Sequence, residues 1–291
     1  MTRPGRLGVF ALAGCLGCGL TGCGGDQAGA ADDGRVDVVV SSYPLEYVAA
    51  EVGGDRVDVT NLVPAGGDSH GLEPTPRDVM TLTEADVVVH LSGALQPAID
   101  DVLAQQEPEH VVDATALADH GEDPHFWLDP VRLAPLGTQV ADELAVVDPD
   151  HADRYAERAE RLAASLQEMD EEYATALAPC RGATLLASHE AFGYLTERYG
   201  LRQVGVAGLD PHVEVSPTRL RRVVDDVRDT GARTIFFEAA AGLGVAETLA
   251  DELGLATDVL HPIERVADEE SYPGLMTANL AALRRGLVCT G

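Results

Sequence analysis

The sequence predicts an α/β protein of two lobes, each with a parallel-rich sheet, joined by one long rigid α-helix. Two observations support this prediction. Short runs of β-branched residues alternate with helical patterns on both sides of the middle of the chain, which is typical of parallel sheets. Between them, residues 148–178 contain no glycine, no proline after Pro149, and apolar residues at steps of three or four. We therefore expect a stiff helix between two α/β halves, and 291 residues leave room for both.

The predicted elements of both halves follow the same rhythm. The first half alternates strands at residues 36–42, 57–63, 86–91 and 110–113 with helices at 43–52, 77–84 and 96–106. The second half alternates strands at residues 183–187, 203–206, 234–237 and 256–260 with helices at 189–199, 218–230, 244–253 and 271–285. No sequence repeat relates the halves. We assign residues 35–147 to the first lobe, 148–179 to the linking helix and 180–291 to the second lobe.

The N-terminus has the parts of an export signal. Arg3 and Arg6 precede an apolar run at residues 7–20, which is too short for a membrane-spanning helix. The run ends in Leu20-Thr21-Gly22-Cys23, which resembles the bacterial lipobox, although a chance cysteine is the alternative. We expect residues 1–22 to be removed, Cys23 to be lipidated and residues 23–34 to form a flexible tether. The protein is then exported and anchored on the outer face of the bacterial cytoplasmic membrane.

The remaining cysteines are Cys180 and Cys289. In an oxidising compartment they can pair, which would tie the start of the second lobe to the C-terminus. We expect this disulfide; two buried free thiols are the alternative.

The charge balance excludes one class of partner. The chain has 49 acidic residues against 20 basic ones, a net charge of −29. Such a surface is repelled by phosphate backbones, so we expect no nucleic-acid binding.

Four residues are candidates for a metal site in the cleft between the lobes, namely His70, His125, His189 and Glu264. Each adjoins a predicted strand or strand-connecting loop, and ligands of open α/β sheets collect outside the carboxyl ends of the strands. Three imidazoles and one carboxylate fill a Zn²⁺ tetrahedron and leave no position for a reacting water, which favours binding over catalysis. Spacing alone does not establish the site, because a lone histidine beside a strand is more often a hydrogen-bonded structural residue.

Four segments carry a family resemblance, which extends over residues 36–291. They are Gly-Gly-Asp-Ser-His-Gly-Leu-Glu-Pro-Thr-Pro at 66–76, Asp-Pro-His-Phe-Trp-Leu-Asp-Pro at 123–130, Ser-His-Glu-Ala-Phe-Gly-Tyr at 188–194 and Phe-Phe-Glu at 236–238. The chain resembles the solute-binding lipoproteins of metal-uptake ABC transporters, in particular the zinc-type members of the cluster A-I family. The resemblance implies a non-enzymatic protein, expected to be a monomer, that captures Zn²⁺ and delivers it to an ABC transporter permease.

The resemblance also assigns roles to residues. It implies His70, His125 and His189 as ligands, and His189 favours zinc because manganese-type relatives usually have Glu there. Glu264 fits the fourth position best, with Glu238 as a rival ligand or supporting acid. Asp68 and Glu73 are expected to orient His70, since a ligating histidine commonly donates its other ring proton to a carboxylate.

Some features depart from the family pattern or leave alternatives open. The His- and acid-rich loop of many zinc-type relatives is absent or reduced to residues 119–123, and His212 is either an accessory metal contact or part of a surface turn. Manganese or iron as the bound metal, or a metal-binding surface adhesin, are the alternative functions. A secreted zinc hydrolase is disfavoured, because the His189-Glu190 pair lacks the second histidine of a His-Glu-x-x-His motif.

Overall fold

The computed structural model describes residues 34–93, 95–238, 244–267 and 269–289. The expected signal segment and Cys23 lie outside these residues. Within the described part of the chain, no helix is long and apolar enough to cross a membrane.

The first lobe contains a parallel four-stranded sheet in the order β2-β1-β3-β4. Its elements are β1 (Val36–Val40), α1 (Tyr43–Gly53), β2 (Val57–Asn61), α2 (Pro76–Glu84), β3 (Val87–His90), α3 (Pro97–Gln106) and β4 (Val111–Asp113). The central strands are nearly continuous runs of buried valine, as a sheet covered on both faces requires. All of these strands were predicted from the same valine runs.

The second lobe repeats the topology with the order β6-β5-β7-β8, again all parallel. Its elements are β5 (Thr184–Ala187), α6 (Gly193–Tyr199), β6 (Arg202–Gly205), α7 (Pro217–Thr230), β7 (Thr234–Phe237), α8 (Gly244–Leu253), β8 (Ala256–Val259) and α9 (Tyr272–Gly286). The predicted fold of two parallel α/β lobes is thus confirmed. Most boundaries of this lobe lie within a residue of those predicted, but α6 begins at Gly193, not at His189. The reason is that the backbone N–H groups of Glu190 and Phe192 donate to Gly208 and Gln203, outside the helix.

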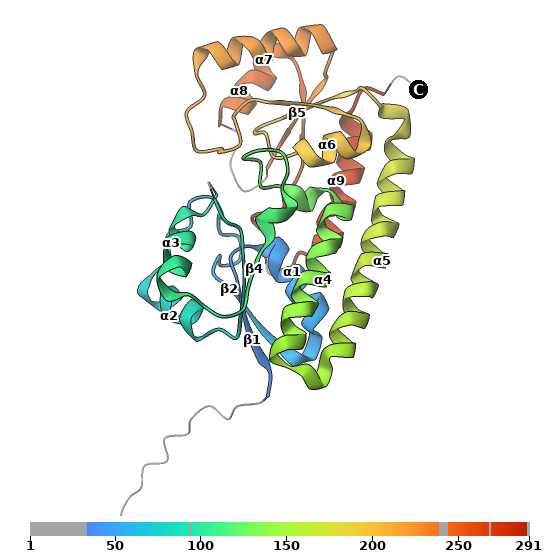
Figure 1. Ribbon diagram of the computed structural model, residues 1–291. Helices are drawn as coiled ribbons and strands as arrows, with labels where there is room; N and C mark the ends of the chain where they lie inside the picture. Colours follow the sequence, from blue (N-terminus) through green and yellow to red (C-terminus); the bar gives the residue numbers. More distant parts are fainter. Residues whose placement is uncertain (1–33, 94, 239–243, 268, 290–291) are drawn as a thin grey trace, which may run out of the picture. The chain divides into compact units, whose positions relative to one another are not determined.

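The predicted long helix is α5 (Ala152–Leu177), with a short 3-10 turn at each end. It packs along α4 (Pro130–Val147), a helix that the sequence did not predict (Figure 1). Pro135 and Gly137 inside α4 look like helix breakers. Gly137 instead lets the helices approach closely, since a Cβ there would lie 3.2 Å from the Leu162 side chain.

One apolar cluster runs through both lobes and the α4–α5 pair. Where the lobes meet, Tyr272 at the start of α9 stacks on Tyr47 of α1 with ring centroids 4.8 Å apart. The Tyr272 hydroxyl donates to the Trp127 carbonyl at 2.6 Å, and the Trp127 indole donates to the Pro262 carbonyl at 2.8 Å. These buried contacts fix the segments that lead to the candidate site.

The predicted disulfide between Cys180 and Cys289 is present, with the two Cα atoms 4.2 Å apart. It joins the chain just before β5 to the segment after α9, at the amino ends of the second-lobe strands. The bond therefore closes the second lobe on the side opposite the carboxyl ends of its strands.

Candidate metal centre

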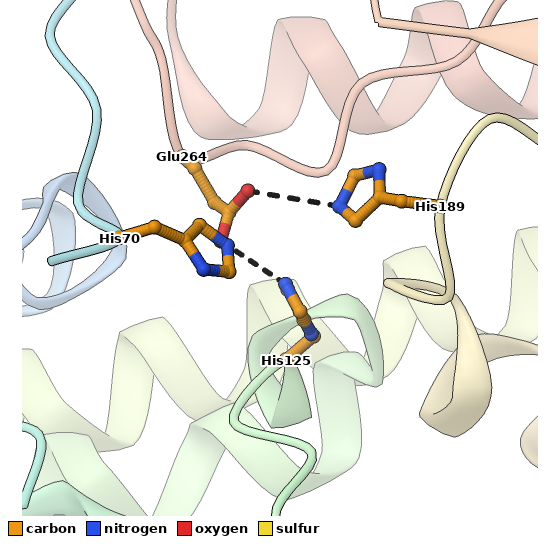
Figure 2. A group of neighbouring side chains, drawn as sticks. All are labelled: His70, His125, His189 and Glu264. Carbon is orange, nitrogen blue, oxygen red and sulfur yellow. Dashed lines mark hydrogen bonds and ion pairs between the residues drawn. The ribbon is translucent and has the colours of Figure 1, made fainter. Parts of the chain in front are cut away.

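The four predicted ligands lie together (Figure 2). One donor atom from each of His70, His125, His189 and Glu264 lies within 4.8 Å of every other. A zinc ion with bonds of about 2.0–2.1 Å in a tetrahedron places its donors about 3.3 Å apart. A contraction of an ångström or so would therefore close the set around one ion.

The topology explains why these side chains meet. His70 is on the connection after β2, His125 follows β4, His189 follows β5 directly, and Glu264 follows β8. All four positions lie beyond the carboxyl ends of parallel strands, where the crossover connections leave a crevice. His189 lies at the position where the strand order reverses, because β5 pairs with both β6 and β7.

A local turn presents two of the histidines. In Asp68-Ser69-His70 the backbone N–H of His70 donates to Asp68 Oδ1 at 2.9 Å, and in Asp123-Pro124-His125 the N–H of His125 donates to Asp123 Oδ1 at 3.0 Å. An aspartate that accepts from the residue two positions later forms a compact Asx turn. The Asp-x-His spacing therefore positions each imidazole from within its own segment.

Asp123 also orients the ring of His125. Its Oδ1 lies 2.7 Å from Nδ1 of His125, while Nε2 of the same ring lies 3.0 Å from Glu264 Oε1. The carboxylate thus holds one ring nitrogen and directs the other into the centre, as supporting acids do at histidine–zinc sites. The sequence analysis missed this role, although the spacing shared with Asp68 and His70 was visible.

His189 is the least satisfied member of the set. Its side chain is 2% exposed, its Nε2 lies 4.0 Å from Glu264 Oε2, and among the described residues that nitrogen has no hydrogen-bond partner. Buried polar atoms are nearly always paired, so an unpaired imidazole nitrogen directed at a carboxylate needs an explanation. A metal ion between the two groups supplies one.

A strained turn presents Glu264. The preceding residue, Ile263, is buried and has a φ of 63°, a conformation that β-branched residues rarely adopt. Such strain persists where the surroundings enforce it, here through the bond from Trp127 to the Pro262 carbonyl, and it concentrates at functional sites. No sequence signal predicted this turn.

The charges in the centre are strongly coupled. Burial disfavours the cationic form of His125, but Glu264 and Asp123 outweigh it and raise its pKa to about 9. Burial lowers the pKa of His189 to about 4. Burial also acts against the Glu264 carboxylate, yet His125 and His70 hold the pKa of Glu264 well below its usual range. A proton on His125 thus balances the buried carboxylate at neutral pH, a role that a bound cation would take over.

Two cavities border the centre. The smaller, of about 280 Å³, is lined by Glu264, with Tyr43 and Val266 among its other residues. The larger, of about 430 Å³, is lined by His70, Leu95, Glu122, Pro124, Glu190, Leu209 and Asp210. His70 is the one predicted ligand in this lining, and its side chain is 9% exposed against 0–3% for the other three. The His70 side chain therefore borders one route between the centre and solvent.

The other predicted residues lie around the four. Asp68 accepts from the His70 backbone, not from its ring, and also contacts Arg265 and His212. Glu238 is outside the four-residue group; its Oε1 lies 3.8 Å from Nε of Arg265, and burial, followed by the charge of Glu264, raises its pKa to about 7. Glu73 is exposed, and the orienting role expected for it stays a prediction.

The fold and the site define a class of protein: two parallel α/β lobes around a buried centre of three histidines and one carboxylate. A family model described as "Zinc-uptake complex component A periplasmic" matches residues 38–286. The chain belongs to this zinc-uptake component A family.

Named relatives agree with this assignment. The chain is 30% identical to the high-affinity zinc uptake system protein ZnuA of Bacillus subtilis over 97% of both chains. It is 31% identical to the zinc-binding lipoprotein AdcA of Streptococcus pneumoniae. The matched part covers 87% of this chain and 56% of AdcA, so AdcA extends well beyond it.

Solved structures give the same result. The laminin-binding protein Lmb of Streptococcus agalactiae superposes with a TM-score of 0.80 at 31% identity, covering 86% of this chain and 99% of that one. The Zn(II)-bound ZnuA-like domain of Streptococcus pneumoniae AdcA superposes with a TM-score of 0.76 at 32% identity, covering 87% and 99%.

Proposed function

We propose that this protein binds Zn²⁺ outside the cytoplasmic membrane and delivers it to the permease of an ABC importer. The observation that carries the proposal is the convergence of His70, His125, His189 and Glu264, two from each lobe, with donor atoms within 4.8 Å. Relatives named for zinc uptake and zinc binding support the identity of the metal.

The donor set favours zinc over manganese or iron. Imidazole suits Zn²⁺ well, whereas Mn²⁺ prefers oxygen ligands, and here three of the four donors are nitrogen. His189 matters most for this choice, because a carboxylate at that position would make the set half oxygen.

The same set supports a transport role without catalysis. Four protein donors fill a zinc tetrahedron, whereas catalytic zinc keeps one position for water or substrate. We propose that zinc is the cargo and that the protein transforms no substrate. Incubating the zinc-loaded protein with a panel of ester and peptide substrates tests this point, and turnover that requires His189 would contradict it.

The lipid anchor and the monomeric state belong to the same proposal. We propose that Cys23 carries the lipid and that one molecule presents both lobes to the permease. Mass spectrometry of the protein extracted from bacterial membranes should find a lipidated N-terminal Cys23. Sedimentation of the soluble form should show a monomer both with and without bound zinc.

The test of function is a competitive titration of the soluble form beginning at Gly24. We expect tight one-to-one binding of Zn²⁺ that outcompetes Mn²⁺, and loss of that preference in His189→Ala. The control is His151→Ala. It removes a histidine that contacts Asp148 at the α4–α5 turn and that belongs to none of the segments carrying a predicted ligand. Equal binding of the two metals, or zinc binding that is unchanged in His189→Ala, would overturn the assignment.

A second candidate rests on the structural neighbours. Lmb is described as a bifunctional protein with adhesin and metal transporting activity. An adhesin role for this chain predicts saturable binding to immobilised laminin, measured with and without zinc at physiological salt. Absence of saturable binding in both states would remove this candidate and leave zinc delivery.

A further inference from the structure

Asp68 joins the two lobes at the edge of the metal centre. Its Oδ1 accepts from the His70 backbone at 2.9 Å within the first lobe. Its Oδ2 accepts from two side chains of the second lobe, Nη2 of Arg265 and Nε2 of His212, the latter at 2.6 Å. One carboxylate therefore holds a ligand segment of the first lobe and two side chains of the second.

Arg265 connects this carboxylate to the opposite ligand. It follows Glu264 in the chain, its side chain is 17% exposed, and its Nε faces Glu238 at 3.8 Å. Beside it, the Gly66 N–H donates to the Val266 carbonyl at 2.8 Å. The segments that carry His70 and Glu264 are therefore fastened directly to each other, across the lobes, without a metal ion.

His212 extends the connection to the loop between β6 and α7. It sits in a third Asp-x-His turn, in which the His212 N–H donates to Asp210 Oδ1 at 2.8 Å. The same turn type presents His70 and His125, but here the ring reaches Asp68 instead of the centre. Leu209 and Asp210, just before it, line the cavity that His70 borders. The loop thus meets the His70 segment at the opening of the centre.

The four ligand segments are not held equally. His125 is completely buried, and its segment is tied to the second lobe through the bond from Trp127 to Pro262 and that from Tyr194 to the Asp123 carbonyl. The His70 segment is the more exposed one. Apart from the contact of its ring with Glu264 at 2.8 Å, it is held to the second lobe by the Gly66–Val266 bond and by those of Asp68. Loss of the metal through the cavity requires His70 to move away, so these bonds resist the motion.

We propose that Asp68, Arg265 and His212 form an interlobe clamp that sets the residence time of the bound metal. The proposal rests on the zinc-binding function proposed above. The three side chains are positioning residues: they are not among the four donors and act by keeping His70 against Glu264. Contacts that hold a complex closed act mainly on dissociation, since association of related variants varies much less.

The test measures zinc dissociation by stopped flow with excess chelator, and association separately. Because His212 is 59% exposed, His212→Ala leaves the core intact. We expect its dissociation rate to rise about three- to tenfold, the effect of losing one charge-assisted hydrogen bond, with association within about twofold. Asp68→Asn should act in the same direction, because the amide oxygen keeps the bond from the His70 N–H while its NH₂ group cannot accept from Arg265 and His212.

The double variant separates a clamp from a general loss of structure. The bond that His212→Ala removes is also lost in Asp68→Asn, which loses the Arg265 bond as well. The double variant should therefore dissociate at the rate of Asp68→Asn within about twofold. His151→Ala, which loses an imidazole–aspartate contact at the α4–α5 turn, is the matched control and should match the wild type. Unchanged dissociation in His212→Ala, or rate increases that multiply in the double variant, would overturn the clamp. Failure of the wild type to bind zinc would instead overturn the proposed function.

Discussion

Asp123→Asn should weaken zinc binding although Asp123 is not among the four donors. Its Oδ1 holds both the backbone N–H and Nδ1 of His125, at 3.0 and 2.7 Å. The asparagine oxygen can keep the backbone bond, but the negative charge that orients the ring and increases its basicity is lost. Loss of such an outer partner typically lowers metal affinity 10- to 100-fold, or about 1.4–2.8 kcal/mol at 1.4 kcal/mol per factor of ten.

The assay is competition with a zinc indicator of known affinity, with circular dichroism of each variant to verify folding. The control is Asp148→Asn, which removes the charge from an aspartate that likewise holds an imidazole Nδ1, that of His151 at 2.9 Å. We expect Asp148→Asn to bind zinc like the wild type. A folded Asp123→Asn protein with wild-type zinc affinity would refute the reasoning that this carboxylate tunes His125.

Three further predictions follow from other contacts. Because the pKa of His125 is raised to about 9 and that of His70 is also raised, zinc should displace at least one proton at neutral pH, and its affinity should increase with pH up to about pH 9. Calorimetry in buffers of different ionisation enthalpy measures this release, and zero release contradicts it. Replacing Cys180 and Cys289 by serine should cost about 4–5 kcal/mol of stability for a bridge spanning 109 residues, seen in urea unfolding, with zinc affinity unchanged. Asp170→Asn should lower stability at pH 7 by about 2 kcal/mol, because Arg198 donates to both Asp170 oxygens. Arg198 also lowers the Asp170 pKa, so this contribution is present above the pKa of the unfolded state and is lost as pH falls through the pKa of the folded state. The difference in melting temperature between the variant and the wild type should therefore shrink below about pH 4.

Much of the fold was predictable because the first-lobe strands are rich in valine and α5 has a long, uninterrupted apolar period. The helix α4 was not, because Pro135 and Gly137 carry the local signal of a break. Its stability comes from packing against α5, where the missing Gly137 side chain admits Leu162. In α4, packing between helices therefore outweighs the low helix propensity of proline and glycine, and local sequence patterns do not reveal such packing.

The candidate site divides in the same way. The three histidines and the glutamate could be proposed from the ends of predicted strands and a family resemblance. The structure brings one donor atom of each within 4.8 Å of the others. Asp123 was within reach, since it repeats the Asp-x-His spacing of Asp68. The left-handed backbone of Ile263 and the contacts between Asp68 and the second lobe were not, because they depend on how distant segments meet.

The apolar cluster that runs through both lobes has a consequence for how the molecule melts. Val38 of the first lobe and Leu185 of the second belong to the same buried cluster, and both are fully buried. Cutting the chain after α4 would expose this surface on both pieces, so neither lobe is expected to fold alone. Heating should then give one calorimetric transition, and zinc should raise its midpoint as a whole, because the ion stabilises a single cooperative unit and not one half of it.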